Sequence, residues 1–186
     1  MNAIVDERNG DWIQTATGRE FWPIDPRRDE VYIEDIAHSL ANMCRFAGHC
    51  REFYSVAQHS ILVSASLPVE HKLWGLMHDA SEAYVVDVPR PIKLFISGYQ
   101  EVEDRVMRVI ADRFGLSMPI PEAVKRADIA ILADEAAQIM LAPPRAWRLP
   151  YPPLGIDIDP WSPATARRRF LEEFASLTAT VKEGSR

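Results

Sequence analysis

The chain is organised around residues 76–84, which read Leu-Met-His-Asp-Ala-Ser-Glu-Ala-Tyr. The stretch places the imidazole of His78 beside the carboxylate of Asp79 in an apolar helical pattern, and Glu82 follows one turn later. Burying three such groups is costly unless a bound ion or a reaction compensates. A His-Asp pair alone also fits a surface pair or a hydrogen-bonded core histidine, so its interpretation depends on what the rest of the chain supplies.

Length and composition indicate one folded domain. The chain has 186 residues, of which 47% are hydrophobic and 26% are charged, as in ordinary globular proteins. The formal net charge of −6 at pH 7 argues against nucleic acid as a partner. No apolar run is long enough to span a bilayer and the first residues lack an export signal, so no membrane partner is expected. Because Cys44 and Cys50 suggest no disulfide framework, we expect a reducing, cytoplasmic location.

Apolar residues spaced three and four positions apart predict an all-α fold with about six or more helices. Helices are expected from residue 33 to about 48, from 56 to 63 behind an N-cap at Ser55, from about 69 to 84, at 99–114, from after Pro121 to about 141, and from 163 onward. Residues 1–30 are mixed, and we expect an irregular arm or short hairpin packed on a single domain of residues 31–186. Prolines predict a loop at 87–93 and an ordered surface loop at 142–161.

Four polar side chains occupy positions where the helical pattern predicts burial: His59, His78, Asp79 and Asp128. A divalent ion held by nitrogen and oxygen needs three or four ligands on rigid elements, with one position open for water. His78 and Asp79 lie roughly 100° apart around a helix axis, so both can reach an ion between them. Asp128 lies in an apolar run at 127–132, where an unpaired carboxylate would be costly. The order His, His-Asp, Asp on three helices therefore predicts a metal site.

With this order of ligands the sequence resembles the HD-domain metal-dependent phosphohydrolases. Within them it is similar to the branch with bacterial 5′-deoxynucleotidases and phage deoxyadenosine triphosphate triphosphohydrolases. The segments that carry the resemblance are 44–46 (Cys-Arg-Phe), 55–60 (Ser-Val-Ala-Gln-His-Ser), 78–83 (His-Asp-Ala-Ser-Glu-Ala), 87–93 (Asp-Val-Pro-Arg-Pro-Ile-Lys) and 125–128 (Lys-Arg-Ala-Asp). The likeness covers residues 33–141, and its motifs are specific for the superfamily and less specific for the substrate. It implies a helical HD-type domain that acts on a small-molecule nucleotide.

The resemblance implies that the four predicted ligands bind one divalent metal ion. The nitrogen and oxygen ligand set favours manganese, cobalt, iron, zinc or magnesium. Such an ion lowers the pKa of a bound water and polarises a phosphoryl oxygen. By the same resemblance, Glu82 handles protons near the attacking water or the leaving oxygen, and Asp87 orients water or the sugar. The position of Asp87 equally suits a turn former.

Three cations match family positions that contact phosphate: Arg45, Lys93 and Lys125. Arg45 offers a bidentate fork, whereas the lysines act as point charges. Phe46 resembles the aromatic residue that walls the nucleoside pocket. Some relatives carry a bulky residue where this chain has Gly48, and this difference leaves the base selectivity open.

The leading hypothesis is metal-dependent hydrolysis of (deoxy)nucleotide phosphoester bonds. Release of tripolyphosphate from a triphosphate and removal of phosphate from a 5′-monophosphate both stay open, as does assembly into a homo-oligomer. One alternative is a non-catalytic nucleotide-binding or signalling module, whose ligand binding would survive Glu82→Gln. Another is a hydrolase of a different phosphoester, such as a cyclic nucleotide.

Overall fold

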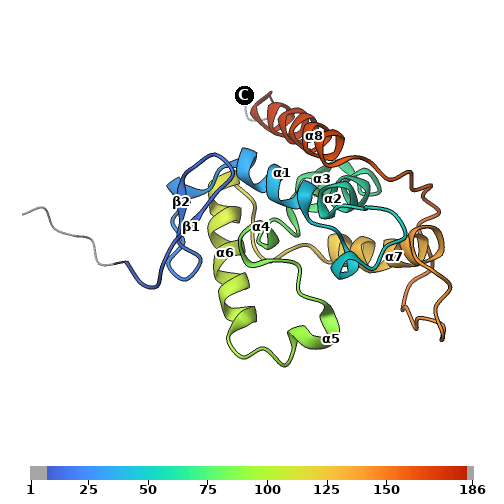
Figure 1. The fold of residues 1–186 in the computed structure, drawn as a ribbon. Helices are drawn as coiled ribbons and strands as arrows, with labels where there is room; N and C mark the ends of the chain where they lie inside the picture. The colour runs from blue at the N-terminus through green and yellow to red at the C-terminus, as the bar shows by residue number, and fades with distance from the viewer. Residues whose placement is uncertain (1–7, 184–186) are drawn as a thin grey trace, which may run out of the picture.

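A computed structural model describes residues 8–183, and its architecture is almost entirely helical (Figure 1). The elements in chain order are β1 (Ile13–Gln14), β2 (Glu20–Phe21), η1 (Arg28–Glu30), α1 (Ile33–Asn42), η2 (Phe46–Gly48), α2 (Val56–Ala65), α3 (Val69–Met77), α4 (Glu82–Val85), α5 (Arg90–Lys93), α6 (Tyr99–Phe114), α7 (Glu122–Ile139) and α8 (Pro163–Glu183). The all-α prediction is confirmed. Residues 1–7 of the expected arm and residues 184–186 lie outside the described part of the chain.

The hydrophobic core lies where α2 packs against α1 and α3 and α8 crosses all three, while α6 and α7 flank this group (Figure 1). Its largest fully buried apolar side chains include Phe21, Ile36, Leu40, Leu76, Met77, Ile110, Ile131 and Phe170. Helix α7 contacts both α2 and α3, whereas α6 contacts α4 and η1. This packing brings helices that are distant in sequence to a common centre.

The N-terminal arm forms a two-stranded antiparallel hairpin that packs on the helices. Ile13 pairs with Phe21 in the ladder. Phe21 is fully buried, and its ring stacks on that of Tyr84 with a centroid separation of 3.7 Å. Thr17 donates hydrogen bonds from its backbone N and its Oγ1 to the carboxylate of Asp35, at 2.8 and 2.9 Å. The arm is therefore fixed to α1 and α4 by both apolar and polar contacts.

The first predicted helix is shorter than its sequence suggests. We expected it to end near Gly48, but α1 ends at Asn42 and Met43 adopts extended backbone. Cys44 then forms an isolated antiparallel bridge with Ser55, which draws the chain out of the helix. The expected N-cap at Ser55 is present, because its side chain accepts a hydrogen bond from the backbone N of Gln58 at 3.1 Å.

The predicted helix at 69–84 is divided in two by a turn. Helix α3 ends at Met77 and α4 begins at Glu82, with backbone hydrogen bonds spaced three residues apart between them, such as that from the N of Ala80 to the O of Met77 at 3.0 Å. This tighter winding places residues three apart above one another. Asp79 and Glu82 therefore share a face.

The predicted loop at 87–93 contains a short helix. Helix α5 spans Arg90–Lys93, with Pro91 in its first turn. Proline is tolerated there because the first backbone N–H groups of a helix have no intrahelical partner. The prediction of a loop was therefore wrong for these four residues.

The connection between α7 and α8 is ordered, as its proline content predicted. Three buried or half-buried side chains form hydrogen bonds with its backbone. Asp134 accepts from the backbone N–H groups of residues 154–156. The amide of Gln138 bonds the backbone of residues 156 and 158, and the amide of Gln58 bonds the backbone of residues 159 and 161. Two of these side chains belong to α7 and one to α2. Within the described residues, no helix is long and apolar enough to cross a membrane.

Candidate metal centre and adjoining cavity

Ligand atoms of His59, His78 and Asp128 all lie within 4.8 Å of one another, and the carboxylate of Asp79 lies against both histidines. The Nε2 of His59 lies 3.3 Å from the Nε2 of His78 and 3.2 Å from the Oδ1 of Asp128. The Oδ2 of Asp79 lies 3.3 Å from the Nε2 of His78 and 3.6 Å from that of His59. Adjacent ligands about 2.0–2.2 Å from a central ion would be separated by about 2.8–3.6 Å in octahedral or tetrahedral geometry. The spacing of the His59, His78 and Asp128 atoms therefore suits one divalent ion, and Asp79 lies beside this group.

Three different segments position the ligands. His59 lies in the middle of α2, His78 and Asp79 lie in the turn between α3 and α4, and Asp128 lies in the second turn of α7. His59 is fully buried and His78 is 8% exposed. Because α2, α3 and α7 contact one another, the core itself fixes the distances between the ligands.

Both imidazoles are oriented by a hydrogen bond on the side away from the ligand cluster. The Nδ1 of His59 is 2.7 Å from the Oε1 of Glu135, and the Nδ1 of His78 is 2.7 Å from the backbone O of Gly75. Each acceptor favours the tautomer with a proton on Nδ1, which directs the Nε2 lone pair toward the centre. Histidine ligands of metal ions are commonly held in this way, so this observation supports the fit to a metal.

Glu135 is a site residue that the sequence interpretation missed. It is fully buried on α7, and its Oε2 lies 3.2 Å from the guanidinium of Arg45. It follows Asp128 by seven residues, which is two helical turns, and this spacing was a signal that could have identified it. Although burial by itself would raise the pKa of Glu135, Arg45 and His59 together lower it.

Arg45 lies inside the centre and not on an open surface. It is 8% exposed, and its Nη1 lies 3.7 Å from the Oδ2 of Asp79. Together with Glu135, this contact makes Arg45 the counter-charge of two carboxylates. If Arg45 contacts a phosphate as expected, it would do so while it is also paired with Asp79 and Glu135.

The electrostatics of the cluster keep its carboxylates charged. The two histidines outweigh burial at Asp128 and hold its pKa well below the usual value. Burial would lower the pKa of both histidines, but the neighbouring carboxylates raise it, most strongly at His78 through Asp79. The carboxylates thus stay charged beside the histidines, and a divalent cation bound there would take the place of the histidine protons.

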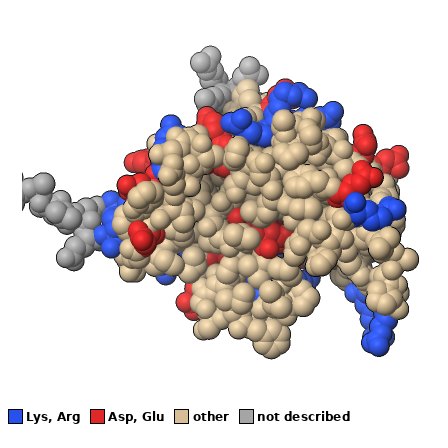
Figure 2. All heavy atoms as spheres, viewed as in Figure 1, with Lys and Arg blue, Asp and Glu red and all other residues tan. Residues whose placement is uncertain are grey.

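A cavity of about 460 Å³ opens beside the ligands. Asp79 and Asp128 reach it from the metal centre, and the predicted site residues Arg45, Glu82, Asp87, Lys93 and Lys125 also line it. In Figure 2, acidic atoms occupy the hollow in the middle of the face, where Figure 1 places α4 between α6 and α7. The volume is within the range of small-molecule sites, which is about 300–1,000 Å³.

Glu82 is the buried acid of this cavity. It is 8% exposed, and its Oε2 has no hydrogen-bond partner among the described residues. Burial raises the pKa of Glu82 well above its usual value, and the charges of Asp79 and Asp87 raise it further. Burial also raises the pKa of Asp87. Both carboxyls can therefore hold a proton close to the metal centre.

The cations of the cavity differ in their availability. The Nζ of Lys93 lies 2.7 Å from the Oε1 of Glu103, whereas Lys125 is largely exposed and lies 3.8 Å from Glu122. Arg90, which the sequence interpretation did not single out, lines the same cavity. The α5 turn thus contributes two cations to the side of the cavity that faces α6.

Phe46 does not belong to the lining of this cavity. Its ring lies 5.2 Å from the guanidinium carbon of Arg45 and 5.9 Å from the ring centroid of Trp147. Phe46 therefore packs against Arg45 on the side of the connection between α7 and α8. Its predicted role as a wall of the nucleoside pocket has no counterpart in these contacts.

Comparison with known proteins gives two similar chains. The uncharacterized protein YfdR of Escherichia coli (strain K12) is 37% identical over 175 residues, which cover 92% of this chain and 98% of YfdR. The uncharacterized protein RCAP_rcc00048 of Rhodobacter capsulatus is 37% identical over 142 residues, which cover 69% of this chain and 72% of that protein. No family model matches the chain.

Proposed function

The chain belongs to the family that includes protein YfdR of Escherichia coli, and we propose that it is a metal-dependent phosphohydrolase of the HD superfamily that acts on a (deoxy)nucleotide. The observation that carries the proposal is the cluster of His59, His78 and Asp128 with Asp79 beside it, which opens onto a cavity lined by a buried acid and several cations. The free thiols of Cys44 and Cys50 suit a cytoplasmic setting.

The residues of the site divide the chemistry among them. A divalent ion bound by the four ligands would supply a water of lowered pKa and a Lewis acid for a phosphoryl oxygen. Glu82 would take or give the proton, because its buried carboxyl holds a proton at higher pH than an exposed one. Asp87, which lines the same cavity, would orient the attacking water or the sugar.

The phosphates would be held by the cations around the cavity. Lys125 and Arg90 are the more available groups, and Lys93 would exchange its ion pair with Glu103 for one with a phosphate oxygen. Arg45 would contribute charge from behind Asp79. These groups serve a monophosphate and a triphosphate equally, so both substrates stay open.

The test is product analysis with purified protein loaded with manganese or cobalt. The four deoxynucleoside 5′-monophosphates and the four triphosphates are incubated in parallel. Orthophosphate from monophosphates alone would identify a nucleotidase, and release of tripolyphosphate would identify a triphosphohydrolase. Absence of any metal-dependent product from both panels contradicts the proposal and favours a binding module or another phosphoester.

Two variants separate the roles of ligand and acid. Asp79→Ala should lose both the metal and turnover, whereas Glu82→Gln should keep the metal and lose about 10²–10⁴-fold in turnover. Glu101→Gln, an exposed change on α6, is the matched control and should behave as wild type. Full turnover by Glu82→Gln would remove Glu82 from the mechanism.

A further inference from the structure

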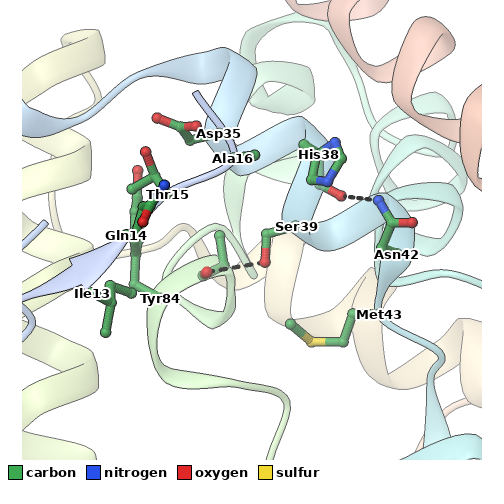
Figure 3. A pocket seen from close by; sticks show the side chains of 11 residues that line it. Ile13, Gln14, Thr15, Ala16, Asp35, His38, Ser39, Asn42, Met43 and Tyr84 are labelled. Carbon is green, nitrogen blue, oxygen red and sulfur yellow. Dashed lines mark hydrogen bonds between the residues drawn. The ribbon is translucent and has the colours of Figure 1, made fainter. Parts of the chain in front are cut away.

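A second cavity, of about 560 Å³, lies between the N-terminal hairpin and α1 (Figure 3). Ile13, Gln14 and Thr15 line one side of it, and His38 and Asn42 of α1 lie on the other. Ala83 and Tyr84 of α4 also line it, so α4 contributes residues to both this cavity and the metal cavity. None of the residues assigned to the metal centre belongs to its lining.

The cavity lining contains a buried carboxylate and, among the described residues, no Lys or Arg. The carboxylate is that of Asp35, whose two oxygens accept hydrogen bonds from Thr17. A phosphate would therefore meet a carboxylate and no cation. The lining disfavours an anionic ligand.

Two residues with amide side chains, Gln14 and Asn42, lie on opposite sides of the cavity (Figure 3). The Nδ2 of Asn42 donates to the backbone O of His38 at 2.8 Å, which leaves its Oδ1 and second N–H group available. Gln14 is exposed and lines the cavity, so its amide is accessible to a ligand. Ser39, in contrast, uses its hydroxyl to donate to the backbone O of Ala83 at 3.0 Å. Amides offer a donor and an acceptor side by side, which matches the edge of a nucleobase.

Part of the cavity lining is apolar. Ile13 and Met43 supply apolar surface, and methionine adapts to flat rings.

We propose that this cavity binds an unphosphorylated nucleoside through its base. The base would lie between Ile13 and Met43 and hydrogen-bond to Gln14 and Asn42, while the absence of cations in the described lining would reject nucleotides. A nucleoside is what remains when a nucleotide loses its phosphates. The idea that the nucleoside is a reaction product that regulates the enzyme rests on the proposed function. The binding of a nucleoside in this cavity does not depend on that function.

The binding test uses the full chain without added metal. Isothermal titration calorimetry is run with the four deoxynucleosides and with the matching 5′-monophosphates. We expect at least one nucleoside to bind, and the matching monophosphate to bind at least tenfold more weakly. Asn42→Ala and Gln14→Ala should each weaken nucleoside binding about fivefold, the value of one neutral hydrogen bond. Ala16→Trp, which fills the cavity from an exposed position, should abolish binding.

Two controls separate this cavity from the metal centre. Asp79→Ala should retain nucleoside binding, and Glu34→Gln, an exposed change on α1, should leave it unchanged. The proposal is overturned if no nucleoside binds, if Asp79→Ala abolishes binding while Asn42→Ala retains it, or if monophosphates bind as tightly as nucleosides. Failure of the proposed function would instead appear as missing turnover in the product assay, which this titration does not involve.

Discussion

Glu135 connects the histidine ligand of α2 to the arginine of the cavity, since one of its oxygens lies beside each. Glu135→Gln keeps an acceptor for the Nδ1 of His59 but removes the charge that opposes Arg45. We expect the affinity for manganese or cobalt to fall about 10- to 100-fold, as is typical when the partner of a histidine ligand is changed. Calorimetric titration of the metal measures this. Glu101→Gln is the control, and an unchanged affinity in Glu135→Gln would show that Glu135 only fills space.

Metal binding should strengthen as the pH rises. The carboxylates around His59 and His78 outweigh burial and raise the pKa of both above 6.5, so the metal-free site binds protons near neutral pH. The metal has to displace those protons, and its apparent affinity should increase from pH 6 to pH 8. Titrations in buffers of different ionisation enthalpy would report the released protons. An affinity independent of pH over this range would contradict protonation of the histidines.

At the residue scale, the sequence predicted those site residues whose chemistry conflicts with their apolar surroundings. His59 and Asp128 stand out because polar groups interrupt buried helical patterns. Glu135 was missed because its neighbours Asp134 and Gln138 make that part of α7 look like a solvated face, whereas Asp134 in fact holds a distant loop. The hydrogen-bond partners of Asp134 and Glu135 are determined by tertiary packing, which cannot be predicted from the periodicity of one helix.

At the scale of elements, Gly75 lets α3 approach α2 closely enough to bring His78 to His59. A Cβ at residue 75 would lie 2.6 Å from Leu67 Cδ1 and 2.9 Å from the Cα of Ser64. Gly75→Ala should therefore destabilise the protein by about 1–3 kcal/mol, although alanine favours helix over glycine by about 1 kcal/mol. Urea denaturation measures the change.

The control for this change is Glu70→Ala, an exposed substitution on the same helix that should alter stability by less than about 0.5 kcal/mol. Because the backbone O of Gly75 accepts from His78, the alanine variant should also bind the metal more weakly. An increase in the free energy of unfolding of Gly75→Ala would contradict this prediction, because it would show that α2 and α3 can move apart without loss of stability.

The elements were predicted well wherever one local signal determined them. Helix α6 spans Tyr99–Phe114, the range expected from its apolar spacing, and α2 begins behind the Ser55 cap. The turn at 78–81 and the early end of α1 at Asn42 could not be predicted in this way. Both coincide with contacts to other segments: Cys44, just after α1, bridges to Ser55, and the turn at 78–81 places His78 and Asp79 against His59 of α2.

At the scale of the whole molecule, a metal at the meeting point of α2, α3 and α7 would bind the folded chain and not the unfolded one. Metal present at 100 times its dissociation constant would add about 2.7 kcal/mol to the free energy of unfolding. For a chain of this length, the melting temperature should then rise by about 5–10 °C. Calorimetry before and after treatment with a chelator checks this. Asp128→Ala is the control and should show no response, and an equal shift in both proteins would argue against this site.

The backbone next to Arg45 is strained. Phe46 and Ala47 have φ values of 54° and 52°, a left-handed conformation that is unfavourable by about 1–2 kcal/mol for each residue with a side chain. Glycine at position 47 would relieve part of this cost, but its greater backbone freedom would loosen the turn that follows Arg45. The strain in this turn would then be the structural cost of holding the Arg45 guanidinium against Asp79 and Glu135.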